Sequence, residues 1–419
     1  MQLFSHIARK LWGRKEQNRV ISAPVVKIAT ASIAIGMAVM ILTISIVTGF
    51  KSEIKKRAIG FAGHIIVSSY TNNNSFEQEP VSVKADFLNI LTKNPEILHV
   101  QPFATKNAII KTAFENQGIV IKGVDKNYKW DFISQYLLEG KIPDYSDTLS
   151  ASKILVSKTI ASKLSLKTGD KLLTYFVGKK RNADSIQNSG YEQRVRKFEV
   201  CGIYQTGFSD VDNNIVFADI KQVQRLNYWK ETDAGGFEIE LKDFEKLDDM
   251  TEWVNGEVGQ GLEARSVKGL YPTLFSWLDL LNSNAAIIIV LMIAVAVINM
   301  ISALLILILE RSNTIGILKA LGGNNALVQK IFLFQSFRIL STGLLVGNIA
   351  GILLALVQMV FKLISLNPDT YYVSFVPVEL HVMDILLVNL LTIVSCLFMM
   401  LLPVLVISKI TPAKTLRFK

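Results

Sequence analysis

Four long apolar runs constrain the fold of this chain more than any other feature. They cover residues 25–48, 285–309, 339–361 and 385–407. An α-helix rises about 1.5 Å per residue, so about 20 apolar residues cross a hydrocarbon core of roughly 30 Å. The sequence therefore predicts four transmembrane helices. With their flanks, the expected spans are residues 25–50, 276–309, 331–363 and 383–407.

Charged residues are too frequent for a chain that lies wholly in lipid. Half of the residues are hydrophobic, yet 19% are charged. The region between the first and second spans, about 225 residues long, has the composition of an ordinary globular protein. It is long enough to bury a core of its own. We therefore expect a large folded domain at residues 51–275, outside the membrane.

Helix and strand patterns in this domain indicate that one subdomain is inserted into another. The helical patterns cover residues 83–92 and 244–254, and the strand patterns cover residues 98–114, 118–124, 237–241 and 263–267. These elements flank a β-rich block at residues 154–217. We expect residues 51–127 and 232–270 to form one α+β subdomain, and residues 128–231 to form a β-rich insert.

Lysine and arginine residues predict the orientation of the spans, because short cytoplasmic flanks carry an excess of basic residues. The basic residues in the short flanks are Arg9, Lys10, Arg14, Lys15, Arg19, Lys27, Arg311, Lys319, Lys330, Lys409, Lys414, Arg417 and Lys419. Both termini and residues 310–330 are therefore expected in the cytoplasm. The large domain and the loop at residues 364–382 are expected on the outside. The net charge of +10 reflects this topology, and we infer no nucleic-acid partner.

Residues 1–24 carry an amphipathic pattern. Leu3, Phe4, Ile7, Leu11 and Trp12 share one helical face, which is typical of a helix in the inner-leaflet interface. A cleaved signal peptide is the alternative. The residues that follow Thr48 do not form a cleavage site, so we expect the first span to remain as an anchor.

The segment at residues 310–322, ERSNTIGILKALG, separates the second and third spans. Its pattern predicts a short helix with Ile315, Leu318 and Leu321 on one face and a glycine stop at Gly322. Such a helix would present a compact apolar knob. On the pattern alone, a short helix that lies on the lipid surface fits equally well.

The third span contains Gly343, Gly347 and Gly351 at four-residue spacing. This spacing removes side-chain bulk from one stripe and predicts a helix-packing face, with a kink as the alternative. Arg338 precedes the stripe, where its side chain can reach the cytoplasmic edge of the membrane. A functional arginine inside the membrane is the alternative.

Motifs for catalysis are absent from the sequence. Gly118 and Gly123 have the glycine spacing of a P-loop, but the Lys-Ser/Thr pair does not follow them. The four histidines are scattered, so we expect no metal site. Cys201 and Cys396 lie at different levels of the expected topology and cannot pair. We predict a chain without catalytic residues and without a cofactor of its own.

Several of these segments resemble one known family. Gly49 and Phe50 after the first span, the step at His64 and Ile65, residues 310–322 and the tail ITPAKTLR match the ABC transporter permeases of the lipoprotein-releasing LolC/LolE family, in the MacB/FtsX superfamily. The likeness covers nearly the whole chain. Thr314 stands where the family commonly has an acidic residue, which removes one polar contact but not the apolar knob.

The resemblance implies an α-helical membrane protein with four transmembrane helices and a large extracytoplasmic α+β domain between the first two. The α+β subdomain is then porter-like. The segment at residues 310–330 is implied to be a coupling helix and loop that insert into a separate ATPase, which binds ATP and Mg²⁺. The residues implied in this coupling are Glu310, Arg311, Ile315, Gly316, Leu318, Lys319, Leu321 and Gly322.

For function, the resemblance implies a bacterial inner-membrane permease subunit that extracts lipoproteins and hands them to a periplasmic carrier. A second permease copy or a paralogue would complete the transporter. The lipoprotein would enter a groove that is lined by the first span and the outer end of the second and is open to membrane lipid. The candidate groove residues are Met40, Ile44, Val47, Phe50, Phe275, Leu278 and Leu281. Periodicity does not identify the face, because the first span is apolar all round.

Two alternatives stay open at this point. A MacB-like exporter of peptides or drugs shares the coupling features, although such exporters often carry the ATPase on the same chain. An FtsX-like signalling subunit would control a cell-wall hydrolase without moving a substrate, although its outer domain is usually much smaller.

Overall fold

The computed structural model of the chain describes residues 22–70, 78–112, 115–146, 152–179 and 191–406. These residues form two compact units. The helical unit contains the described residues within Met1–Ser52, Trp277–Ser365 and Phe375–Lys419, and the α+β unit contains those within Glu53–Ser276 and Leu366–Ser374. The amphipathic pattern at residues 1–21 and the tail at residues 407–419 lie outside the described residues.

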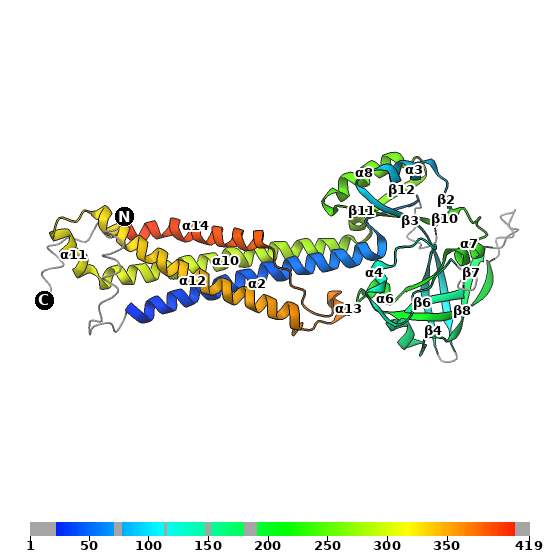
Figure 1. Cartoon of the computed structure of the whole chain (residues 1–419), viewed down its shortest axis with the longest axis horizontal. Coiled ribbons are helices and arrows are strands. Elements are labelled where there is room, and N and C mark those ends of the chain that lie inside the picture. Colours follow the sequence, from blue (N-terminus) through cyan, green and yellow to red (C-terminus); the bar gives the residue numbers. More distant parts are fainter. Residues whose placement is uncertain (1–21, 71–77, 113–114, 147–151, 180–190, 407–419) are drawn as a thin grey trace. The chain divides into compact units, whose positions relative to one another are not determined.

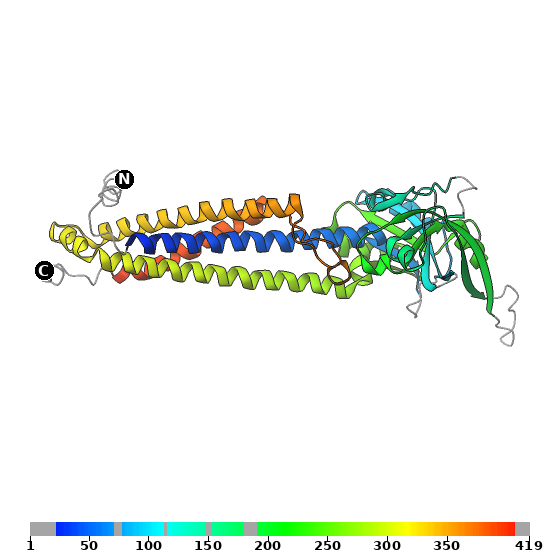
Figure 2. The same cartoon turned by 90° about the horizontal axis from the view of Figure 1, so that it is seen from below.

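Four long helices correspond to the four expected spans, as Figures 1 and 2 show. They are α2 (Ser22–Ala62), α10 (Pro272–Glu310), α12 (Asn325–Phe361) and α14 (Val382–Val406). All four are long and apolar enough to cross a membrane. Both α2 and α10 continue beyond their apolar runs as unbroken helices into residues of the α+β unit. Two shorter helices, α11 (Ser312–Ala320) and α13 (Pro368–Tyr371), lie in the connections.

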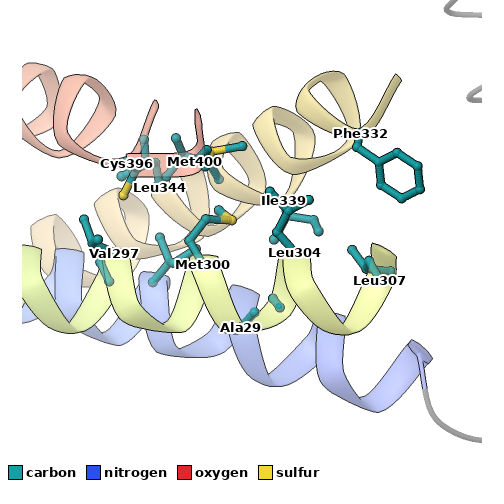
Figure 3. Close-up of a cluster of buried hydrophobic side chains, with 14 of the residues drawn as sticks. Ala29, Val297, Met300, Leu304, Leu307, Phe332, Ile339, Leu344, Cys396 and Met400 are labelled. Atoms are coloured by element: carbon teal, nitrogen blue, oxygen red, sulfur yellow. The ribbon is translucent and has the colours of Figure 1, made fainter. Parts of the chain in front are cut away.

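Apolar side chains from all four long helices form the core of the helical unit. Figure 3 shows this cluster, with Val297, Met300 and Leu304 of α10 directed toward the neighbouring helices. From α2, the cluster includes Met37, Met40 and Ile41, none of which exposes any surface. The span in α2 is the most buried of the four, with half of its most apolar stretch buried.

The glycine stripe of α12 lies directly against α2. A Cβ atom at Gly343 would lie 2.8 Å from the Ile33 side chain, and one at Gly347 would lie 2.6 Å from the Ala34 carbonyl oxygen. One at Gly351 would lie 3.0 Å from Cα of Ala38. Side chains at Gly343 and Gly347 would collide with α2, and one at Gly351 would require its neighbour to shift. The three glycines therefore allow the close approach of these two helices.

The α+β unit contains one sheet of ten strands, in the order β12-β1-β11-β3-β4-β9-β6-β8-β5, with β7 paired to both β3 and β8. The strands from the flanking subdomain are β1 (Ile65–Ser69), β3 (Ile97–Lys111), β4 (Asn116–Val124), β11 (Gly236–Leu241) and β12 (Leu262–Ser266). Those from the insert are β5 (Leu137–Gly140), β6 (Lys153–Ser157), β7 (Lys171–Lys179), β8 (Tyr191–Tyr204) and β9 (Ile215–Asp219). A separate pair is formed by β2 (Val81–Ser82) and β10 (Asp233–Ala234).

Strand pairing joins the two expected subdomains into one hydrogen-bonded structure. The strands β4 and β9 pair in parallel, and β3 pairs with β7 through Ile109 and Tyr175. The six strands β3, β4, β9, β6, β8 and β7 therefore close into a ring, which we call the barrel. Because β3 and β4 belong to the flanking subdomain, the insert does not fold as a separate sheet.

Helices cover the rest of the sheet. In Figure 1, α3 (Asp86–Lys93) and α8 (Leu247–Glu257) lie together beside β11 and β12. Their buried residues are Phe87 and Leu91 in α3, and Leu247, Met250 and Val254 in α8. The short helices are α4 (Asp131–Ser134), α5 (Lys158–Lys163), α6 (Ser209–Asp212), α7 (Ile220–Asn227) and α9 (Val267–Leu270).

Candidate functional site

The segment after α10 forms the expected short helix. Glu310 ends α10, and α11 begins at Ser312. At the other end, the amide of Gly323 donates to the Leu318 carbonyl at 2.9 Å, and Gly322 adopts a φ of +91°. A glycine with positive φ is the usual way to end a helix, because it has no Cβ that would clash.

The apolar residues of α11 do not share one face, contrary to the sequence pattern. Ile315 is 1% exposed and belongs to the core of the helical unit, whereas Leu321 is 81% exposed. Six residues correspond to about 600° of rotation, which places these two side chains about 120° apart. Leu321 instead shares its side of the helix with Ile317, which is 46% exposed and four residues earlier.

The other predicted coupling residues are divided between these two environments. Gly316 is buried, and Arg311, Leu318 and Lys319 are half-buried. Glu310 and Gly322 are exposed. The surface available to a partner is therefore centred on Leu321, together with Ile317, which the sequence analysis did not select.

Four of the seven candidate groove residues are buried within the chain. Met40 is in the core of the helical unit with no exposed surface, and Leu278 is 1% exposed. Phe50 packs edge-on against Trp277, with ring centroids 6.3 Å apart, and Phe275 stacks on Phe244. Every residue from 36 to 50 is buried or half-buried. In this conformation these four side chains do not line an open groove.

The remaining candidates, Ile44, Val47 and Leu281, are half-buried. Of α2 and α10, the two helices that carry these candidates, α10 has most of the exposed apolar surface. Its residues are Leu280, Ile287, Ile288, Val290, Leu291, Val295 and Ile298, each more than a third exposed. The sequence does not reveal this surface, because a helix that is apolar all round has no hydrophobic period from which to select a face.

Gly49, the first residue of the Gly-Phe step, accommodates the chain between α12 and α14. A Cβ at position 49 would lie 2.7 Å from the carbonyl oxygen of Pro377. Close by, the amide of Glu379 donates to the carbonyl of Ser45 at 3.0 Å. Gly49 is thus required where one backbone passes directly over another.

His64, in the second matching step, connects the end of α2 to the sheet. Its Nδ1 accepts a hydrogen bond from the amide of Leu241 in β11 at 3.2 Å. Burial lowers the pKa of His64 below its usual range, and the carboxylate of Glu240 opposes this shift. Ile65, the next residue, begins β1 and is fully buried. This step is a structural joint between a helix and a sheet.

A buried ion pair forms a second joint at the same helix end. The ammonium of Lys122 in β4 donates to a carboxylate oxygen of Glu238 in β11 at 2.5 Å and to the carbonyl of Phe61 in α2 at 2.6 Å. Burial lowers the pKa of Lys122, and Glu238 partly offsets this effect. A charged pair in a dry site requires such complete pairing. The sequence gives no sign that Lys122 is buried and paired, because its partner is 116 residues away.

A cavity of about 350 Å³ lies next to this joint, between α2, α4, β3 and β11. Some of the charged and polar side chains in its walls are paired within the protein. Lys129 contacts Glu240 at 2.8 Å, and Gln101 donates to Glu238 at 2.9 Å. The buried Nε2 of His99 also lines the cavity and has no hydrogen-bond partner among the described residues, but one ring nitrogen does not identify a ligand. Over the described part of the chain, no three His, Cys, Asp or Glu side chains are grouped so that they could hold a metal ion.

Four membrane-length helices, with an α+β domain inserted between the first two, define a multi-pass membrane protein with a large extramembrane domain. Residues 28–256 match the family of MacB-like periplasmic core domains, and residues 286–412 match the FtsX-like permease C-terminal family. The first match alone covers more than half of the chain. The chain therefore belongs to the MacB/FtsX superfamily of membrane permeases.

Curated relatives match over nearly the full length. The lipoprotein-releasing system transmembrane protein LolE of Haemophilus influenzae is 24% identical over 413 residues, covering 96% of each chain. The corresponding LolC protein of Xylella fastidiosa is 24% identical over 408 residues, covering 92% of each. Among solved structures, the periplasmic region of MacB from Actinobacillus actinomycetemcomitans is 13% identical, with a TM-score of 0.35, over 52% of this chain and 94% of that one.

Proposed function

We propose that this chain is the permease subunit of an ABC transporter that extracts lipoproteins from the bacterial inner membrane. The observation that carries this proposal is the match to lipoprotein-releasing relatives over 96% of the chain, including both the α+β domain and the four helices. The large domain is then periplasmic, and α11 faces the cytoplasm. The chain functions beside a second permease, which is either another copy or a paralogue.

The energy source is a separate ATPase, which holds the ATP and Mg²⁺. Support for its docking site comes from α11, where Leu321 and Ile317 form an exposed apolar surface on a short helix. An apolar surface outside the spans is costly to leave in water. In this proposal, the ATPase covers it and drives the permease through α11.

The substrate sets a physical requirement. A triacylated lipoprotein holds its acyl chains in the bilayer, and full exposure to water would cost tens of kcal/mol at about 0.8 kcal/mol per methylene. The route out of the membrane must therefore be apolar and open to lipid. The exposed apolar face of α10, from Leu280 to Ile298, together with half-buried Ile44 and Val47 of α2, supplies such a surface. A periplasmic carrier then shelters the acyl chains.

Depletion of the chain in cells tests this function. Outer-membrane lipoproteins should accumulate in the inner membrane, and the unaltered chain should restore their sorting. Val47→Asp should fail to restore sorting while it still copurifies with the ATPase, because a charge in the route repels acyl chains. Met40→Asp is not a suitable probe, since Met40 lies in the core and its substitution would disturb folding.

Normal lipoprotein sorting after depletion would overturn the proposal. If export of a soluble peptide were lost instead, the chain would be a MacB-like exporter. If only the activity of a cell-wall hydrolase were lost, it would be an FtsX-like signalling subunit.

A further inference from the structure

A buried arginine joins three parts of the chain that are far apart in sequence. Arg57, in the part of α2 that belongs to the α+β unit, is 4% exposed. Its Nε and Nη2 donate to one carboxylate oxygen of Glu53 at 2.9 and 2.7 Å. Its Nη1 donates to the carbonyl of Thr206, which follows β8, and to the carbonyl of Tyr372 at 3.2 Å. Tyr372 lies in the connection between α12 and α14.

This connection belongs to the α+β unit, although the helices that it joins do not. Leu366–Ser374 groups with the α+β unit, whereas α12 and α14 belong to the helical unit. Two further contacts attach it there. The rings of Phe208 and Tyr372 lie 5.3 Å apart, and Ser209 donates through Oγ to the Pro368 carbonyl at 3.3 Å.

The entry to α10 reaches the same place. Phe208, which is 1% exposed, also packs edge-on against Tyr271, with ring centroids 5.6 Å apart. Tyr271 directly precedes α10. One cluster within the α+β unit therefore includes Arg57 of α2, Tyr271 at the entry to α10, and Tyr372 of the connection between α12 and α14. We call the cluster of Arg57, Thr206, Phe208, Tyr271 and Tyr372 the junction.

The barrel side of the junction is shaped to receive the guanidinium. The buried carboxylate of Asp212 accepts hydrogen bonds from the amide of Thr206 at 3.1 Å, from its hydroxyl at 2.8 Å and from the amide of Gly207 at 2.8 Å. These bonds fix the turn that presents the Thr206 carbonyl to Arg57. Gly207 has a φ of +73°, and a Cβ there would lie 2.5 Å from Nη1 of Arg57. Any other residue would displace the guanidinium.

The loop side of the junction is held in an unusual backbone conformation. Tyr372 has a φ of +59°, which residues other than glycine rarely adopt. Surrounding contacts must hold such a residue in place. Here the hydrogen bond from Arg57 and the packing of the ring on Phe208 supply those contacts.

The loop keeps its own hairpin without Arg57. The amide of Val376 donates to the Ile364 carbonyl at 3.0 Å, and the amide of Leu366 donates to the Ser374 carbonyl at 2.9 Å. These bonds join the two arms of the loop to each other and do not involve the barrel. Removal of Arg57 should therefore detach the loop from the barrel and leave the hairpin formed.

We propose that Arg57 is a positioning residue that fastens the α12–α14 connection to the barrel, so that movement of α12 and α14 is transmitted to the α+β unit. The inference rests on the proposed function, which supplies the ATP-driven movement. Arg57 contacts no substrate in this role. It determines whether the barrel follows the movement of α12 and α14.

Two fluorescent labels test this transmission in the full complex of permeases and ATPase in nanodiscs, after Cys201 and Cys396 are replaced by Ser. One label is placed at Leu353, which is 56% exposed on α12, and the other at Leu138, which is 52% exposed in β5. ATP should change both signals in the unaltered complex. Arg57→Gln should keep the Leu353 response and lose the Leu138 response. Lys56→Gln, an exposed neighbour with the same loss of charge, should keep both.

A cross-link separates positioning from a general structural role. In the Arg57→Gln background, cysteines at Ser209 and Pro368, which are already in contact, are joined by a short thiol cross-linker. The cross-link should restore the Leu138 response and lipoprotein release, which Arg57→Gln should lower by about tenfold. Resistance of the domain to trypsin checks folding. If Arg57→Gln fails to fold, Phe208→Leu weakens the same attachment from the barrel side.

A Leu138 response that persists in folded Arg57→Gln would overturn the proposal, as would a cross-link that restores nothing. If the unaltered complex releases no lipoprotein, yet its Leu138 response depends on Arg57, the proposed substrate is wrong and the role of Arg57 stands.

Discussion

Asn348 in α12 and Asn389 in α14 exchange two side-chain hydrogen bonds, of 2.8 and 2.9 Å. Each amide also donates to the carbonyl four residues earlier in its own helix. Inside a membrane, such a pair aligns two helices, because water does not compete for the hydrogen bonds. The pair therefore fixes the register of α12 on α14. These are the two helices that the connection at the junction joins.

Asn348→Leu should destabilise the helical unit by about 1 kcal/mol, since it leaves Asn389 without its partner across the helices. Unfolding in mixed detergent micelles measures this cost. Asn348→Leu combined with Asn389→Leu should cost less than the sum of the two single changes, because no lone amide remains. Strict additivity would show that the two side chains do not interact.

Gly347→Ala should destabilise the same unit by about 1–3 kcal/mol, because the new methyl group collides with the backbone of α2 at Ala34. Gly36→Ala is the matched control. It also adds one methyl group to a spanning helix, but no atom lies within 4 Å of the new Cβ, so stability should not fall. Equal unfolding curves for the two variants would contradict the close contact between α2 and α12.

Local patterns predicted most of the individual elements. The four apolar runs correspond to α2, α10, α12 and α14, and the strand patterns at residues 98–114, 118–124, 237–241 and 263–267 correspond to β3, β4, β11 and β12. These signals depend only on neighbours in sequence, because the hydrophobic period and the length of a segment decide whether it forms a helix or a strand. The helix expected at residues 83–92 begins later, at Asp86, since residues 83–84 form a turn after β2 and Ala85 is extended.

Long-range pairing could not be predicted in this way. The barrel closes through β3 and β7, and the buried Lys122 meets Glu238 from a distant strand. A single sequence contains no signal for such partners. The buried face of α2 could not be predicted either, because a helix that is apolar all round shows no contrast between an apolar and a polar face. Met40 was therefore predicted to line a groove, whereas it lies in the core. The role of Arg57 was hidden for the same reason, because its partners Thr206 and Tyr372 are far from it in the sequence.

Leu321→Asp should weaken binding of the ATPase by about tenfold or more, because it would place a charge in an apolar groove of the ATPase. The chain should stay folded, since the Leu321 side chain is exposed in the free subunit. Ile317→Asp should act in the same way. Ile315→Asp is the contrast, because it places a charge in the core and should lower the yield of folded protein. Copurification and size-exclusion profiles separate the two effects.

Undiminished ATPase binding by both Leu321→Asp and Ile317→Asp would mean that α11 lies on the lipid surface. Leu318→Asp is less informative, because that side chain is half-buried and affects folding and binding together.

Single cysteines at Leu138 and Tyr371, in a chain without Cys201 and Cys396, should react with an impermeant thiol reagent added to spheroplasts. Both side chains are exposed and belong to the α+β unit. A cysteine at Asn324, at the start of α12, should react only after the membrane is opened, as should one at Thr415 in the tail. The distribution of lysine and arginine predicts this result. Labelling of Asn324 in intact spheroplasts would contradict the orientation.

Release from reconstituted vesicles tests the central claim most directly. Vesicles should contain the permease, its ATPase and a fluorescently labelled lipoprotein, with a soluble lipid-sheltering carrier outside, and the measured quantity is labelled lipoprotein bound to the carrier after the vesicles are removed. The account predicts that transfer requires both ATP and the carrier. It also predicts that Val47→Asp abolishes the transfer while ATP hydrolysis continues. Transfer that proceeds without ATP, or ATP-driven release of a soluble peptide while the lipoprotein stays in the vesicle, would contradict it.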